Sequence, residues 1–283
     1  MKYLPNLILG HRYKLILCLL ICTVIIMPGC QRNEAQKMFD KGLAFWEAEK
    51  YEEAIQNFVA LTKAFPEHQL VDDSLFWIAN IYEHSLKNPK QTIRFYRSLS
   101  TKFTQSEYHL QSLVGLARVR ALEGDEGKRK AIRIHRKLQK QLEIDQNFEE
   151  WENNQIRLSQ LFFDLKQYQQ ARIELKQLIV KRPESRFVPK AYYKIGRSFL
   201  LEGKIELARM IFQEVDKKFS QQKITLASAI SLANIYEQTD RLKMAIGVYQ
   251  TVINRLERKD VFYQLAKDQI KKLTLRLRKT NTG

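Results

Sequence analysis

The chain carries few of the side-chain combinations on which enzymes depend. Its five histidines, at positions 11, 68, 84, 109 and 135, follow no spacing that metal ligands adopt. The sequence also contains no paired-histidine helix motif, glycine-rich phosphate loop or nucleophile elbow. We therefore expect no catalytic residues, no metal site and no cofactor, and we look for binding rather than catalysis.

Cationic side chains are the more informative group. Within residues 126–143 they follow helical spacing on one side of the segment, at Arg129, Arg133, Arg136, Lys137 and Lys140. The other side carries Ala131, Ile134, His135, Leu138 and Leu142. A cationic helix face suits an anion, such as a lipid headgroup, a glycan or an acidic partner protein. The alternative is a solvated face on a protein whose net charge is +17.

The N-terminal residues have the composition of an export signal. Lys2, Arg12 and Lys14 precede an uncharged run from Leu15 to Met27, which is shorter than the ~20 residues that a membrane-spanning helix needs. The run ends in Pro28, Gly29 and Cys30. A small residue before a cysteine at this place resembles the lipobox of bacterial lipoproteins.

That resemblance implies cleavage before Cys30, with a diacylglycerol on its thiol and an acyl group on the new amine. Residues 1–29 would then be the signal peptide and residues 30–34 a lipidated tether. Cys18 and Cys22 would leave with the peptide, so no disulfide could form within one mature chain. The alternatives are an uncleaved signal anchor in the inner membrane and ordinary secretion with cleavage nearby.

Nucleic acid is another partner class that a sequence pI near 9.7 suggests. An exported chain meets little nucleic acid, and the basic run has no interleaved aromatic residues on which bases could stack. We therefore expect no nucleic-acid partner.

A repeat of 37 to 40 residues organises the rest of the chain. A small residue is followed four and seven positions later by larger, mostly apolar residues. The small residue recurs at Ala54, Thr92, Ala131, Ala171, Ala208 and Ala245. This spacing marks one face of an α-helix.

A second helix precedes each of these, marked in most units by a small residue with an aromatic residue three positions later. The pairs are Gly42/Phe45, Ala79/Tyr82, Ser159/Phe162, Gly196/Phe199 and Ala233/Tyr236; the third unit has Ala117 but Arg120 in place of an aromatic residue. Together the two patterns resemble the tetratricopeptide repeat, whose standard unit has ~34 residues. The resemblance implies an all-α, right-handed superhelical solenoid of about six helix hairpins over residues 35–258.

The resemblance also implies a groove lined by the first helix of each hairpin. The pentapeptide ANIYE occurs twice, and its asparagines, Asn80 and Asn234, fall on the groove side of that helix. Lys190, Lys194 and Arg197 fall on the same side in the fifth unit. We expect these five residues to contact a partner. Arg118 and Arg157 stand where a clamp for a terminal carboxylate would want asparagine, so such a clamp is not expected.

Residues 259–279 read as a helix that caps the last hairpin, followed by a tail of residues 280–283. The stripe expected to face the last hairpin is Phe262, Leu265, Ala266, Ile270, Leu273 and Leu277, with basic residues opposite. A solenoid end would otherwise expose its core.

Lipobox and long repeats together look like BamD-type lipoproteins of outer-membrane protein assembly, and residues 182–215 resemble CpoB-type cell-envelope coordinators. They imply a lipid-anchored scaffold on the periplasmic face of the bacterial outer membrane, which holds envelope proteins or their peptide segments. The alternatives are an envelope protein that binds anionic lipid or glycan, a pilus or secretion pilot lipoprotein, and a cell-division coordinator.

Overall fold

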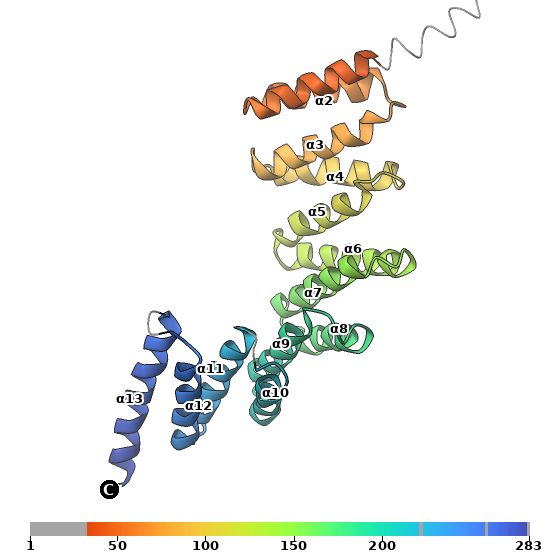
Figure 1. Ribbon diagram of the computed structural model, residues 1–283. Coiled ribbons are helices and arrows are strands. Elements are labelled where there is room, and N and C mark those ends of the chain that lie inside the picture. Colours follow the sequence, from red (N-terminus) through yellow and green to blue (C-terminus); the bar gives the residue numbers. More distant parts are fainter. Residues whose placement is uncertain (1–32, 221–222, 258–259, 282–283) are drawn as a thin grey trace, which may run out of the picture. The chain divides into compact units, whose positions relative to one another are not determined.

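The structure is a computed structural model that describes residues 33–220, 223–257 and 260–281 (Figure 1). The expected signal peptide, Cys30 and the last two residues of the expected tail lie outside these ranges. The described residues form helices joined by short turns and contain no strand, so the all-α prediction is confirmed.

Consecutive helices pair into hairpins. Residues 33–47 are helical and pair with α2 (Tyr51–Ala64). The next pairs are α3 (Leu70–His84) with α4 (Pro89–Lys102), α5 (His109–Ala121) with α6 (Gly124–Ile144), α7 (Phe148–Asp164) with α8 (Tyr168–Lys181), α9 (Val188–Leu201) with α10 (Ile205–Lys218), and α11 (Lys223–Gln238) with α12 (Leu242–Asn254). A last helix, α13, covers Val261–Asn281.

The described residues divide into two compact units, with the division between Ile134 and His135 inside α6. Within each unit the helices follow one another as neighbouring pairs (Figure 1). Each therefore has its own apolar interior, which surrounds Phe58 and Ile78 in the first unit and Phe212 and Tyr249 in the second.

The six small residues of the repeat lie where two helices approach each other closely. All six are fully buried: Ala54, Thr92, Ala131, Ala171, Ala208 and Ala245. The side chains four positions later are buried as well, including His135. Small side chains let two helix backbones approach, and the larger residue one turn on fills the space beside them.

Two first helices need glycine at their small position. A Cβ on Gly42 would lie 2.6 Å from Cε1 of Phe58, and one on Gly196 would lie 2.7 Å from Cε1 of Phe212. In both cases the ring belongs to the second helix of the same hairpin. The aromatic ring therefore occupies the volume that any other side chain would take.

The turn inside each hairpin uses a residue in the left-handed conformation. Positive φ angles occur there at Glu49, Lys87, Gly124, Lys166, Gly203 and Asp240. In four turns the next residue donates its backbone N–H to the carbonyl of the aromatic residue five positions earlier, as Lys204 does to Phe199 at 2.9 Å. This is the Schellman arrangement, which satisfies carbonyls at the end of the first helix.

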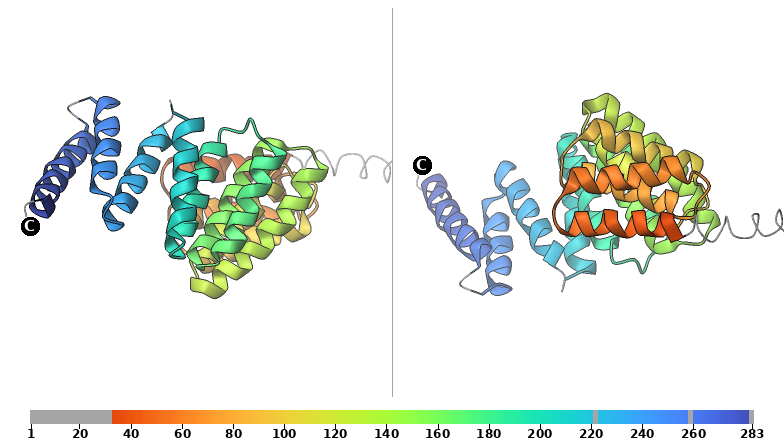
Figure 2. Two further views of the ribbon diagram at one scale, coloured as in Figure 1. Left: turned by 90° about the horizontal axis from the view of Figure 1, so that it is seen from below. Right: turned by 90° about the horizontal axis from the view of Figure 1, so that it is seen from above.

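The last helix packs on α12 (Figure 2). Ala266 and Leu273 are fully buried there, and Ile270 and Leu277 pack against the same interior. The expected stripe is wrong for Phe262 and Leu265, which are 50% and 43% exposed. The contact with α12 covers only the side of α13 that carries the other four residues.

Candidate partner-binding surface

Three cations gather on one side of α9, and we call them the α9 cluster: Lys190, Lys194 and Arg197. Their spacing of four and three residues places them one above another along the helix. Lys190 and Arg197 are exposed. Lys194 is half-buried against α7, where its Nζ contacts Oε1 of Gln160 and lies 5.1 Å from the ring centroid of Phe163. The sequence predicted these three residues as groove residues, and the fold brings them together.

The surroundings of Lys194 disfavour its charged form. Burial, together with the charges of Lys190 and Arg197, lowers the pKa of Lys194 to about 8, and Asp164 opposes this shift. The side chain is therefore charged at neutral pH in a place where little water screens it. Such a site attracts an anion more strongly than a fully hydrated lysine does.

The predicted groove residue Asn234 lies on α11 in the second unit. Its side chain is exposed, and its Oδ1 accepts a hydrogen bond from the hydroxyl of Tyr249 at 2.8 Å. Together with Glu237, Gln238 and Arg276 it lines a hollow of about 480 Å³. Asn80, its counterpart in the first unit, is half-buried on α3.

The five basic residues predicted on α6 differ in their surroundings. In the first unit, Arg129 and Arg133 lie 3.7 and 3.9 Å from carboxylate oxygens of Glu126. In the second unit, Arg136 lies 3.2 Å from Oε1 of the buried Glu174. Lys137 and Lys140 are exposed and have no ion-pair partner among the described residues. Arg136 therefore stabilises a buried carboxylate, and only Lys137 and Lys140 are unengaged.

Sequence reasoning missed the role of the glutamate in ANIYE. In the first unit, Glu83 accepts two hydrogen bonds from Arg118, at 2.6 and 2.7 Å, and one from the hydroxyl of Tyr96. In the second unit, Glu237 lies 3.1 Å from Nζ of Lys272. Both cations come 35 residues after their glutamate. A search for opposite charges one repeat apart could have found both pairs.

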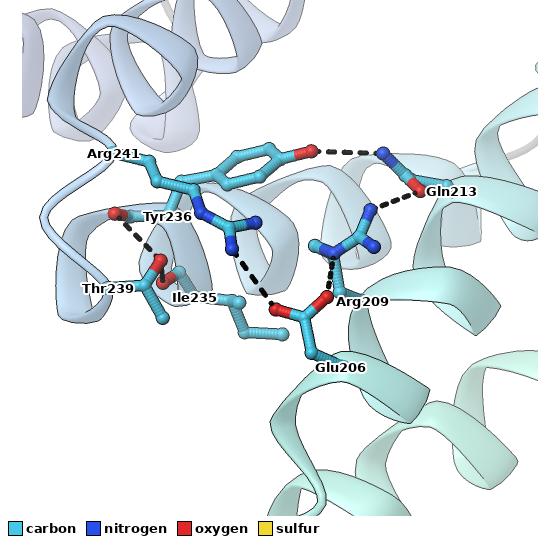
Figure 3. Close-up of polar contacts among 7 residues, drawn as sticks. All are labelled: Glu206, Arg209, Gln213, Ile235, Tyr236, Thr239 and Arg241. Carbon is cyan, nitrogen blue, oxygen red and sulfur yellow. Dashed lines mark hydrogen bonds and ion pairs between the residues drawn. The ribbon is translucent and has the colours of Figure 1, made fainter.

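Similar polar contacts join other neighbouring hairpins of the second unit. Figure 3 shows those around α10, where Glu206 pairs with Arg209 of the same helix at 2.7 Å and with Arg241, in the turn between α11 and α12, at 3.4 Å. Gln213 donates to the hydroxyl of Tyr236 at 2.9 Å. Exposed pairs of this kind add little to stability because water and salt screen them, so they select neighbours more than they stabilise them.

Side chains from α6, α7 and α8 form a buried polar layer in the second unit. His135 Nδ1 lies 2.7 Å from Oδ1 of Asn154, and burial lowers the pKa of His135. Gln155 donates to the backbone carbonyl of Glu174 at 3.1 Å and to Gln177 at 2.9 Å. Burial raises the pKa of Glu174, which Arg136 and Gln155 oppose. Most of these groups pair with one another, so this layer joins helices, while Oε1 of Gln155 is buried without a hydrogen-bond partner among the described residues.

In the described part of the chain, no cluster of three or more His, Cys, Asp or Glu side chains could hold a metal ion. Among the same residues, no helix has both the length and the apolar composition needed to cross a bilayer. Cys30, the predicted lipid attachment site, is not among them.

Comparison with known proteins adds the class of the fold. The tetratricopeptide repeat model matches residues 73–106, 155–185 and 190–221, which are the second, fourth and fifth hairpins. A solved tetratricopeptide repeat protein from Parabacteroides merdae is 15% identical over 88% of this chain and 93% of its own, with a TM-score of 0.55. The solved MamA protein is 16% identical over 67% of this chain and 95% of its own, with a TM-score of 0.50. The comparison with curated protein sequences found no significant match.

At these identities the likeness concerns the fold alone. Each of the two units is built from consecutive helix hairpins whose fold is similar to that of tetratricopeptide repeats. Repeats of this kind present extended surfaces to other proteins, so the fold is that of a protein–protein interaction scaffold.

Proposed function

We propose that the chain is a non-enzymatic scaffold that binds acidic segments of partner proteins at the α9 cluster. The observation that carries the proposal is the unbalanced positive charge there. Among the described residues, Lys190 and Arg197 have no carboxylate partner, and Lys194 is half-buried beside them. Carboxylates of a partner would neutralise this charge where screening by water is weakest.

We further propose that the scaffold works in the bacterial envelope, anchored through a lipid on Cys30, with outer-membrane protein assembly as its setting. The support is the sequence alone: the uncharged run from Leu15 to Met27, followed by Gly29 and Cys30. A single acyl chain binds a membrane weakly, and stable anchoring needs two or more, which the lipoprotein modification supplies.

A charge-reversal experiment tests the binding surface. We expect Lys190→Glu with Arg197→Glu to lower the yield of partners crosslinked in intact envelopes by about tenfold, since two attractive contacts become repulsive. Recovery of a β-barrel assembly component by the unaltered chain would support outer-membrane assembly. The same yield from the double variant would refute the α9 cluster as the binding site.

The matched control also tests a second candidate function, which is the binding of anionic lipid or glycan. Arg133→Glu with Lys137→Glu makes the same change in charge on α6. We expect it to leave partner crosslinking unchanged. Loss of binding to anionic lipid vesicles or lipopolysaccharide in this variant alone would instead favour a lipid- or glycan-binding protein.

A further inference from the structure

The last helix has three sides of different chemistry. One side packs on α12 through Ala266, Ile270, Leu273 and Leu277. A second side is polar and exposed, with Gln264, Lys267, Lys271 and Arg278. The third side borders α11, because Lys272 and Arg276 each lie 3.1 Å from Oε1 of Glu237.

The third side exposes apolar side chains that capping does not require. Val261 is 79% exposed, Leu265 43% and Leu275 50%. A helix that only covers the end of a solenoid needs polar residues wherever it meets water. The second side of α13 follows that rule and the third does not. An exposed apolar side rimmed by charge is the usual mark of an interaction site.

Two hollows border this side. The first has about 390 Å³ and is lined by Asp268, Lys271, Lys272, Leu275, Arg276 and Lys279. The second is the hollow of about 480 Å³ that Asn234 lines on α11, and Arg276 belongs to both. We call Val261, Leu265, Lys272, Leu275 and Arg276 the terminal surface. It offers apolar contacts next to Lys272 and Arg276, and Lys271 lies at the first hollow beside Leu275.

Charge decides which occupant fits. Four cations and Asp268 line the first hollow, and Lys272 and Arg276 pair with Glu237 at its edge, which leaves Lys271 without an ion-pair partner among the described residues. A second copy of this strongly basic chain would be repelled. A flat bilayer would reach protruding side chains but not the hollow between α11 and α13. A peptide segment with both carboxylates and apolar side chains can fill the hollows and match their charge.

We propose that the terminal surface binds an acidic, amphipathic segment of a partner protein. Its apolar side chains lie against Leu265 and Leu275, and its carboxylates lie near the exposed Lys271 at the first hollow. This inference rests on the proposed scaffold function and adds a second contact region to the α9 cluster.

The test uses the full chain and a fluorescein-labelled synthetic helix of Leu and Glu with Leu on one side. Fluorescence anisotropy gives its affinity. We expect Leu265→Ser with Leu275→Ser to weaken binding about tenfold, through lost apolar contact. Val180→Ser is the matched control, because Val180 is 79% exposed on α8, and it should leave the affinity within about twofold. A twin peptide with Lys in place of every Glu should not bind.

The other outcomes overturn the inference. No binding by the unaltered chain, or equal binding by the double leucine variant, removes the terminal surface as a peptide site. If Lys190→Glu with Arg197→Glu abolishes binding and the leucine variant does not, the scaffold proposal stands and this inference falls. Anionic vesicles or a second copy of the chain that depend on Leu265 and Leu275, with no peptide binding, would assign the surface to lipid or to self-association.

Discussion

At the scale of single residues, Lys194 combines burial with like-charged neighbours. Its pKa of about 8 lies well below the ordinary value of 10.5, so it is protonated at pH 7 and largely neutral at pH 9. Between pH 7 and pH 9, Lys194 holds its proton more often in the unfolded chain than in the folded one. The contribution of Lys194 to folding stability therefore rises with pH across that window, while its attraction for anions falls.

This titration predicts a pH-dependent affinity. Binding of a polyglutamate peptide, which lacks the apolar side that the terminal surface needs, should weaken between pH 7 and pH 9, because one of the three charges in the α9 cluster is lost. Lys194→Arg should remove most of the weakening, since a guanidinium stays charged throughout. Anisotropy titrations at several pH values measure it. A decline of equal size in the arginine variant would mean that another group titrates.

At the scale of helices and turns, the repeat was predictable because packing imposes it. Every hairpin needs a small residue where two backbones meet, and the sequence repeats that residue at a nearly constant distance. The left-handed turn residues were harder to find. Glu49, Lys87 and Lys166 adopt positive φ although their side chains give no sign of it, so only Gly124 and Gly203 mark the turn by residue type.

The turn conformation predicts a stabilising substitution. Lys166 has φ of 58° and an exposed side chain without a contact to another described residue. Lys166→Gly should raise the free energy of unfolding by ~0.5–1 kcal/mol, because glycine avoids the clash of Cβ in this conformation. Urea denaturation measures the change.

The control for this substitution is Lys176→Gly, an exposed position inside α8. There glycine should lower the free energy of unfolding by ~1 kcal/mol, because it loses more backbone freedom in a helix. If both variants are destabilised alike, the left-handed turn does not strain the lysine.

At the scale of the whole molecule, sequence predicted the surface less well than the fold. It identified the α9 cluster, because helical spacing alone places those cations together. It assigned Leu265 to the buried stripe, because periodicity shows that a residue is apolar but not whether a neighbouring helix covers it. It also treated Arg136 as an anion contact, although the buried Glu174 one repeat later already engages it.

The lipid anchor is a property of the whole chain and gives its own prediction. Cys30→Ala should move the protein from the membrane fraction to the soluble periplasmic fraction, because the thiol that carries the diacylglycerol is absent. Fractionation of cells followed by immunoblotting measures this. The control is Gly196→Ser, which alters a buried helix contact but keeps Cys30. The folded fraction of this variant should remain with the membrane. A Cys30→Ala chain that stays in the membrane would indicate an uncleaved anchor.

The ion pairs that link neighbouring hairpins also limit which rearrangements of the repeats the protein tolerates. The same position holds a small residue in all six hairpins, alanine in five and threonine in one, so this contact does not fix their order. The ion pairs do: Glu83 pairs with Arg118, Glu206 with Arg241, and Glu237 with Lys272. Shuffling the repeats would keep the stacking and separate each acid from its base. The apolar contacts thus stabilise the packing of one hairpin on the next, and the ion pairs determine which hairpins are neighbours.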